Sequence, residues 1–276
     1  MLLQNKVAVI TGGTGVLGSA LTKAIAAEGA KVAILGRSLE KGEKLAAEIK
    51  ATGGTALALS VDVCDKATIE AAHKTINEKL GLVDILLNGA GGNHPDGVTK
   101  DEFYDNTTPK DDDFQDFFKL GLGGVEHVYN LNYMGTFIPT QVFAKDMVGR
   151  KECSVLNISS VSAGLPLTKV PAYSAAKAAI SNFTHWLAVY FAKEGIRVNA
   201  LVPGFFLTEQ NRTLLTNEDG SLTSRGEKIL SQTPMGHFGE PEDLVSTVLW
   251  LCNPASKFVT GITVPVDGGF TAFNGV

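Results

Sequence analysis

Cysteine is scarce in this chain, with three residues in 276: Cys64, Cys153 and Cys252. They are far apart, odd in number and do not match the spacing of a metal site. We therefore expect reduced thiols, no bound metal and a cytoplasmic location. Long apolar runs are missing too, because no stretch approaches the ~20 residues that a membrane-spanning helix requires. The first predicted strand follows Met1 so closely that no signal peptide is expected.

An excess of either charge is also missing. The 24 lysines and arginines are dispersed, and 29 acidic residues bring the formal net charge to -5. Neither a nucleic acid nor an anionic membrane is therefore expected as a partner. Apolar residues, in contrast, make up 44% of the chain. A chain of this length and composition can bury a substantial core in one large domain.

Strand-like and helix-like segments alternate along the chain without a linker. Apolar, β-branched runs predict strands near residues 6–10, 31–35, 55–60, 83–87, 153–158, 196–202 and 262–266. Helices are predicted near residues 15–28, 39–51, 65–80, 124–148, 171–193 and 240–252. This alternation predicts an α/β fold, a doubly wound (Rossmann) parallel sheet of seven strands with helices on both faces, in a single domain over residues 1–276.

Two stretches, residues 91–123 and 205–238, interrupt the alternation of strands and helices. Both follow predicted strand ends, and ligands in such sheets bind beyond the carboxyl ends of the strands. Loops of this length in a compact domain are usually functional. We therefore expect both stretches to be substrate loops that border the ligand site.

A glycine-rich turn, Thr11-Gly-Gly-Thr-Gly-Val-Leu-Gly18, follows the first predicted strand. Gly12, Gly13 and Gly15 permit a tight turn and a close approach of the backbone to a ligand. A strand, a glycine turn and a helix in this order indicate a pyrophosphate site at the helix N-terminus. The alternative is a strand-to-helix turn without a ligand.

Tyr173 and Lys177 lie four residues apart in a predicted helix, which places both side chains on one helix face. A nearby ammonium group favours phenolate, so we expect the pKa of the tyrosine to be lowered towards neutral pH. The pair alone is common on solvated helix faces. It gains weight from Ser160, thirteen residues before Tyr173, and from the glycine turn.

With these features in place, the chain resembles the short-chain dehydrogenases/reductases over nearly its whole length. The matching segments occur in the family's order: Thr11–Gly18, Asp62-Val63, Asn88-Gly-Ala-Gly91, Asn132, Ser160, Tyr173-x-x-x-Lys177, Pro203-Gly204 and Asp267-Gly-Gly269. The resemblance implies an NAD(P)-dependent oxidoreductase that interconverts an alcohol and a ketone. It also implies a homotetramer, as an analogy with the family.

The resemblance implies four catalytic residues. Tyr173 is similar to the general acid/base that protonates the carbonyl oxygen, and Ser160 to the second hydrogen-bond donor to that oxygen. Lys177 is similar to the residue that lowers the tyrosine pKa and binds the nicotinamide ribose. Asn132 is similar to the asparagine that holds a water for a proton relay.

Alternatives remain for two of these residues. Ser160 could cap the end of a strand, although of the three nearby serines only Ser160 has the family's offset from the tyrosine. Asn130 could replace Asn132, but Gly135 follows Asn132 at the family's spacing.

The cofactor-binding residues are likewise implied by the resemblance. They are Gly12, Thr14, Gly15, Val16, Leu17, Arg37, Ser38, Asp62, Val63, Asn88, Gly89, Ala90, Tyr173, Lys177, Pro203, Gly204, Phe206 and Thr208. Val16 departs from the family, many of whose members carry a third glycine there. Because a helix is expected to begin at this point, right-handed geometry can accommodate the side chain.

The end of the second predicted strand bears on the choice of cofactor. An acidic residue there would bind the ribose 2′-hydroxyl of NAD, but this chain has Gly36, followed by Arg37 and Ser38. A guanidinium and a hydroxyl suit a phosphate, so we predict that NADP is preferred and NAD is accepted as well. The alternative is that Arg37 stacks on the adenine.

Substrate recognition is expected from the two long loops. Asn93 and His94 follow a strand end, where they could bind hydroxyls or a carboxylate, or belong to a surface turn. Arg212 is a candidate for an anionic group, or a solvent-facing residue. Ser162 could also contact substrate, and so could Ser160 and Tyr173.

Within the family, His94-Pro95, Phe205–Arg212 and Pro265–Phe270 are similar to one subgroup, the D-mannonate oxidoreductases, or fructuronate reductases, of the short type. The resemblance implies a keto sugar acid as substrate, D-fructuronate in equilibrium with D-mannonate. The rivals are a gluconate 5-dehydrogenase, a 3-oxoacyl thioester reductase and, more remotely, a non-catalytic dinucleotide-binding sensor.

Overall fold

Seven parallel strands form one sheet in the order β3-β2-β1-β4-β5-β6-β7. The structure is a computed structural model that describes residues 1–208 and 212–275, so the predicted substrate loop 205–238 lies partly, at residues 209–211, outside the described residues. The strands are β1 (Val7–Thr11), β2 (Lys31–Gly36), β3 (Thr55–Ser60), β4 (Ile85–Asn88), β5 (Cys153–Ile158), β6 (Ile196–Pro203) and β7 (Thr263–Val266). The predicted α/β class and all seven predicted strands are confirmed.

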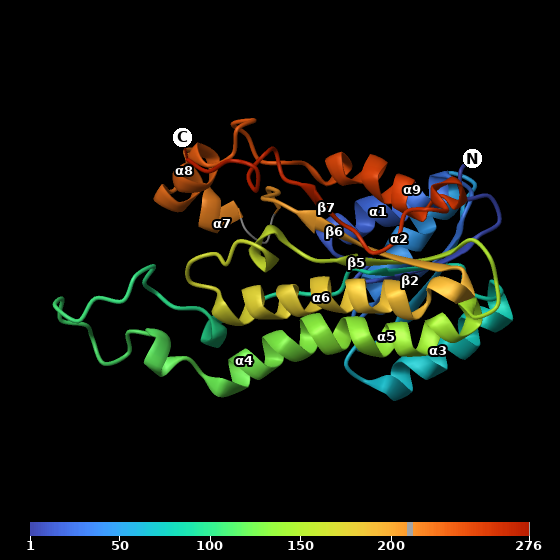
Figure 1. Ribbon diagram of the computed structural model, residues 1–276, viewed down its shortest axis with the longest axis horizontal. Helices are drawn as coiled ribbons and strands as arrows, with labels where there is room; N and C mark the ends of the chain where they lie inside the picture. Colours follow the sequence, from blue (N-terminus) through green and yellow to red (C-terminus); the bar gives the residue numbers. More distant parts are fainter. Residues whose placement is uncertain (209–211, 276) are drawn as a thin grey trace.

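Helices cover both faces of the sheet (Figure 1). One face carries α1 (Val16–Ala27), α2 (Leu39–Ala51) and α9 (Val245–Cys252); the other carries α3 (Lys66–Lys79), α4 (Leu122–Tyr129), α5 (Gly135–Phe143) and α6 (Pro171–Tyr190). Alternate residues of the central strands therefore enter two separate cores, Ile10 on the first face and Val9 on the second. This explains why these strands are apolar on both sides. No helix in residues 1–208 or 212–275 is long and apolar enough to cross a membrane.

The order of the strands reverses next to β1. Its neighbours are β2 on one side and β4 on the other, and the connections from their carboxyl ends lead in opposite directions. Thr11 and Asn88 are paired at the ends of β1 and β4. Such a switch point opens a crevice beyond the strand ends, where ligands of doubly wound sheets bind.

The helix predicted over residues 124–148 is interrupted. A π-helical turn, Asn130–Met134, separates α4 from α5, and a 3₁₀ turn, Ala144–Met147, follows α5. Side chains in this region bond to the backbone four residues earlier, the Asn132 amide to the Val128 carbonyl (2.7 Å) and the Thr136 hydroxyl to the Asn132 carbonyl (2.9 Å). Such bonds compete with the regular helical pattern, and π turns often occur at functional sites.

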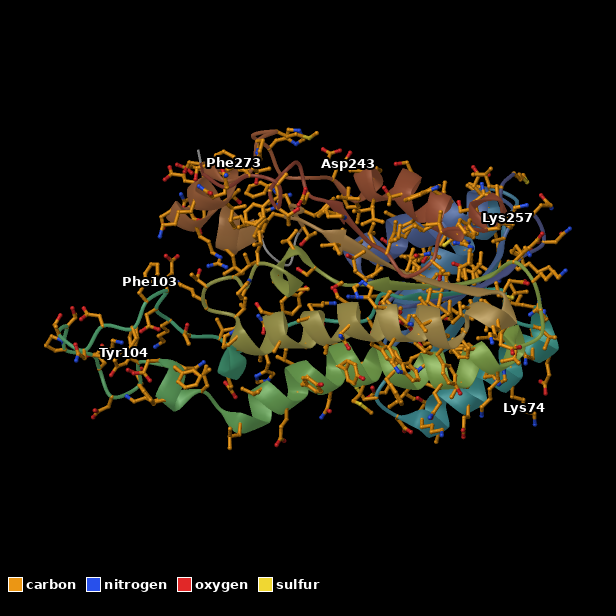
Figure 2. All side chains as sticks on the ribbon, in the orientation of Figure 1. Lys74, Phe103, Tyr104, Asp243, Lys257 and Phe273 are labelled. Carbon is orange, nitrogen blue, oxygen red and sulfur yellow. The ribbon has the colours of Figure 1, made fainter. Side chains whose placement is uncertain are left out.

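Residues 93–121 form an arm that extends away from the body of the molecule (Figure 1). Figure 2 shows Phe103 and Tyr104 on this arm. Lys110 stabilises it, with Nζ 2.9 Å from Asp101 and 4.8 Å from the centroid of the Tyr104 ring. The second long segment contains α7 (Arg212–Leu215) and α8 (Ser224–Ser231). An ion pair of 2.7 Å between Glu102 and Lys228 joins the arm to α8.

Candidate active site

A cleft of about 830 Å³ opens at the switch point, beyond the carboxyl ends of β1, β2 and β4. Every residue of the predicted cofactor set lines it except Asn88. The cleft also brings together residues that are far apart in sequence, such as Gly12, Tyr173 and Thr208. The predicted cofactor residues are therefore close enough to act on one ligand.

The glycine turn fits closely against β4. Gly12 has a φ of +65°, and a Cβ atom there would lie 2.7 Å from the Gly89 carbonyl oxygen. A Cβ at Gly18 would collide with the Gly12 carbonyl oxygen. Gly15 is the N-cap of α1 and Val16 is the first residue of that helix, as expected. The turn therefore presents the N-terminus of a 12-residue helix to the cleft, an arrangement that suits a pyrophosphate.

Asn88 serves the protein interior instead of the cleft. Its amide nitrogen donates to Thr140 Oγ1 and to Asn157 Oδ1, both at 2.9 Å. Asn157 in turn donates to Thr184 Oγ1 at 2.9 Å. This buried network connects β4, β5, α5 and α6. The amide nitrogen of Asn88 is therefore a structural tie beneath the cleft, and a contact of this residue with the cofactor stays a prediction.

The four predicted catalytic residues converge from three elements. Tyr173 and Lys177 lie on α6, Ser160 follows β5, and Asn132 lies in the π-helical turn. Lys177 Nζ lies 5.5 Å from the centroid of the Tyr173 ring and donates to the Ile158 carbonyl at 2.8 Å.

Gly91 lies between the π-helical turn and α6. A Cβ atom at Gly91 would be 2.7 Å from Asn132 Oδ1 and 3.2 Å from Lys177 Nζ. The absence of a side chain at position 91 therefore lets Asn132 and Lys177 approach each other.

The neighbouring serines have different roles. Ser159 Oγ donates to the Lys177 carbonyl at 3.0 Å and lies 2.7 Å from Ser181 Oγ, so it fixes the end of β5 to α6. Ser160 faces the cleft, and its Oγ accepts a bond of 3.3 Å from the Ser162 backbone. Ser162 does not line the cleft. Ser159 also lines the cleft, but its hydroxyl is engaged with α6. The serine at the thirteen-residue offset is the one whose hydroxyl interacts with Tyr173.

Asn132 is fully buried, and its side chain fixes the start of the arm. The amide nitrogen donates to the Gly92 carbonyl at 2.7 Å, and Oδ1 accepts from the Gly92 backbone at 3.3 Å. The same nitrogen bonds to the Val128 carbonyl. Asn132 therefore holds the segment that follows β4 against α4, and its participation in a proton relay stays a prediction.

Burial determines the protonation of the pair on α6. It lowers the pKa of Lys177 to about 8. Burial also raises the pKa of Tyr173, and the hydroxyl of Ser160 opposes this increase. The sequence predicted a lowered tyrosine pKa, but in this structure the loss of hydration outweighs the neighbouring polar groups. Tyr173 is therefore a phenol at neutral pH, the form that can give a proton to a ketone oxygen.

Three further predicted substrate residues lie outside the cleft. Asn93 is exposed and caps the His94 backbone at 3.0 Å, and His94 Nδ1 accepts from the Asp96 backbone at 3.2 Å. These hydrogen bonds are typical of a surface turn, which is the alternative to substrate binding that the sequence suggested for both residues. Arg212 is the exposed first residue of α7, the solvent-facing alternative.

Sequence reasoning missed two residues that line the cleft, His127 and Leu131, and gave Asn130, which also lines it, only as an alternative to Asn132. Their spacing of three and four places them on one helix face, just before Asn132. That spacing could have identified them.

Comparisons with known proteins agree with this geometry. A family model described as short chain dehydrogenase matches residues 6–219. An uncharacterized oxidoreductase of Bacillus subtilis, UxuB, is 53% identical over 275 residues, which cover 99% of this chain and 98% of the relative. A 3-oxoacyl-[acyl-carrier-protein] reductase of Synechocystis is 31% identical over 273 residues, 98% of this chain and 99% of that protein.

A solved structure is also similar over almost the whole chain. It is a Haemophilus influenzae protein, provisionally assigned as a D-mannonate oxidoreductase, with bound NAD. The two chains are 49% identical with a TM-score of 0.96, and the match covers 99% of this chain and 98% of that one.

Proposed function

The chain belongs to the short-chain dehydrogenase family, and on that premise we propose that it interconverts D-fructuronate and D-mannonate with a nicotinamide cofactor. The convergence of Tyr173, Ser160 and Lys177 on a dinucleotide-sized cleft carries the proposal of hydride chemistry on a ketone. The substrate is supported by the provisional assignment of the Haemophilus influenzae protein and by the segments His94-Pro95, Phe205–Arg212 and Pro265–Phe270. A homotetramer in the cytoplasm is proposed by family analogy alone.

The residues of the site suit the reduction of a carbonyl group. A bound nicotinamide would supply the hydride. Negative charge then develops on the substrate oxygen, and Ser160 and Tyr173 are placed to donate hydrogen bonds to it. Tyr173 gives its proton to that oxygen, because burial keeps the phenol protonated. The ammonium of Lys177 stabilises the phenolate that remains and is held in place by the Ile158 carbonyl.

The cofactor end of the cleft supports use of both dinucleotides with a preference for NADP. Arg37 and Lys41 line this end, and Gly36 stands where a carboxylate would select NAD. The Thr14 hydroxyl occupies the space beside Gly36, since a Cβ there would lie 2.8 Å from Thr14 Oγ1. The bound NAD of the Haemophilus influenzae protein weakens the argument for strict NADP use. Two cations, with no carboxylate at position 36, favour a 2′-phosphate but do not exclude a hydroxyl.

Exchange of Arg37 for Asp is expected to raise the NAD/NADP ratio of kcat/KM by at least about 100-fold, because a carboxylate repels the 2′-phosphate and binds the 2′-hydroxyl. Steady-state kinetics with NADH and NADPH measure this ratio. Lys44, exposed on the following helix α2 but outside the cleft, provides the control Lys44→Asp, which should leave the ratio unchanged. An unchanged ratio in Arg37→Asp would mean that Arg37 does not contact the 2′ position.

The proposed substrate is tested with a panel of ketones assayed with both cofactors. We expect kcat/KM for D-fructuronate to exceed that for 5-ketogluconate and for a 3-oxoacyl thioester by at least about 100-fold, a difference of roughly 3 kcal/mol in transition-state binding. The thioester tests the second candidate, which the 31% identical reductase of Synechocystis supports. A higher kcat/KM for either competitor would replace the proposed substrate, and no turnover with any ketone would favour the non-catalytic sensor.

A further inference from the structure

A second cavity, of about 530 Å³, lies beside the cleft, between the arm, the loop that follows β5 and the first turns of α6. The two spaces share a wall. Ser160 and Tyr173 line the cleft, whereas Ser162 and Ser174 line the cavity. The cavity therefore begins one or two residues from the groups that hold the reacting carbonyl. Its other walls are mainly apolar, and few polar groups in an apolar pocket are typical of small-molecule sites.

Lys169 lines this cavity in an unusual backbone conformation. Its φ is +73°, in the left-handed region that non-glycine residues seldom adopt. The Thr99 backbone donates to the Lys169 carbonyl at 2.9 Å, which ties the arm to the loop after β5. Strained residues of this kind persist where the surrounding structure holds them, often at functional sites. The conformation fixes the position from which the lysine side chain extends.

The charge of Lys169 is not balanced by the carboxylates beside it. Asp101 pairs with Lys110 at 2.9 Å, and Glu102 pairs with Lys228 at 2.7 Å. The pKa of each carboxyl is lowered mainly by its own lysine partner and to a smaller degree by Lys169. Within the described part of the chain Lys169 forms no ion pair. A half-buried lysine in this position can bind an anion from outside the chain.

Two serine hydroxyls in the cavity wall also lack partners among the described residues. Ser162 and Ser174 are 1% and 6% exposed, and the Oγ atom of each is buried without a hydrogen bond. A buried polar group without a partner destabilises the fold, so each such group needs an explanation. A serine hydroxyl can reorient by rotation about χ1, which lets both hydroxyls bond to a group that enters the cavity.

We propose that this cavity is the subsite for the carboxylate end of the substrate, with Lys169 as its ion partner and Ser162 and Ser174 as hydrogen-bonding contacts. The inference rests on the proposed function, because it assumes a keto acid held at its carbonyl by Ser160 and Tyr173. In D-fructuronate three hydroxylated carbons separate the ketone from the carboxylate. Lys169 thus takes the role that the sequence suggested for Arg212.

Lys169→Asn tests the subsite, because asparagine tolerates a left-handed backbone and removes the charge. We expect KM for the keto acid to rise at least about 20-fold with kcat within about threefold, since the ion pair forms equally in the ground and transition states. KM for the neutral ketose, in which a hydroxymethyl group replaces the carboxylate, should change less than twofold. Lys169→Arg keeps the charge and should restore KM for the acid to within about fivefold of the wild type.

Lys257, at the far end of the molecule in Figure 2, provides the matched control Lys257→Asn, which should leave both KM values unchanged. Calorimetric binding of D-mannonate gives a readout that does not depend on turnover, and we expect Lys169→Asn to weaken it at least about 20-fold. Equal changes for charged and neutral ketones, or none for either, would overturn the subsite. A wild type that reduces no keto acid would overturn the proposed function instead. In that case the binding of D-mannonate still tests the proposed subsite. A wild type that does not bind this anion would overturn it.

Discussion

Replacement of Tyr173 by Phe is expected to lower kcat for ketone reduction by at least about 10³-fold, because it removes both the proton donor and one of the two groups that stabilise the developing oxyanion. The ring remains, so its packing beside Lys177 is preserved. Binding of NADPH, followed by the change in nicotinamide fluorescence, should stay within a few-fold of the wild type. Loss of turnover without loss of cofactor binding separates a chemical role from a structural one.

Tyr190 provides the matched control. It lies near the end of the same helix, α6, and is 65% exposed. Tyr190→Phe removes an identical hydroxyl and should leave kcat unchanged. If Tyr173→Phe kept more than about a tenth of the wild-type rate, general acid catalysis by this residue, normally worth 10²–10⁴-fold, would be excluded.

Replacement of Lys177 by Met should have two opposite effects. We expect kcat to fall about 100-fold or more, because the phenolate left by proton transfer loses its cation. At the same time the cofactor-free protein should become more stable at pH 7. The depression of the Lys177 pKa from 10.5 to about 8 corresponds to about 3 kcal/mol of cost for the buried charge. The lost hydrogen bond to Ile158 offsets about 1 kcal/mol of the gain.

The pH dependence identifies the source of this gain. A lysine with a lowered folded-state pKa destabilises the fold fully below about pH 8, progressively less up to 10.5, and no longer above that value. Lys177→Met should therefore raise Tm by roughly 4–8 °C at pH 7, and the increase should fall above pH 8 and vanish before pH 10.5 is reached. Thermal unfolding of the cofactor-free variants measures this, with Lys257→Met as the exposed control. A Tm increase that is the same at every pH would mean that packing, not charge, is responsible.

Central strands such as β1 and β6 could be predicted from the sequence because they are buried on both faces and therefore form continuous apolar runs. The glycine turn could be predicted as well, since only glycine fits the left-handed geometry at position 12 next to β4. The shared helix face of Tyr173 and Lys177 followed from the periodicity of one helix, whereas Ser160 was assigned by its resemblance to the family's motif. These features depend on local geometry, which the order of residues determines directly.

Features that depend on distant contacts could not be predicted in this way. The buried amide network around Asn88 requires the positions of Thr140 and Asn157, which lie 52 and 69 residues away. The raised pKa of Tyr173 reflects burial by the assembled fold, which no four-residue spacing reveals. No pattern in the sequence pointed to Lys169. Its charge is available to a ligand because Asp101 and Glu102 already pair with two other lysines, Lys110 and Lys228.

The way the arm is attached has a consequence for engineering. The Asn132 side chain forms hydrogen bonds with both backbone groups of Gly92, just before the arm. The Gly121 backbone, at the other end of the arm, donates to the Asp96 carbonyl at 3.0 Å, so the two ends of the arm are held in place. Segments of other lengths could thus replace the arm between these two ends while Ser160, Tyr173 and Lys177 keep their positions. Exchanging the arm among relatives would be a direct route to catalysts with altered substrate range.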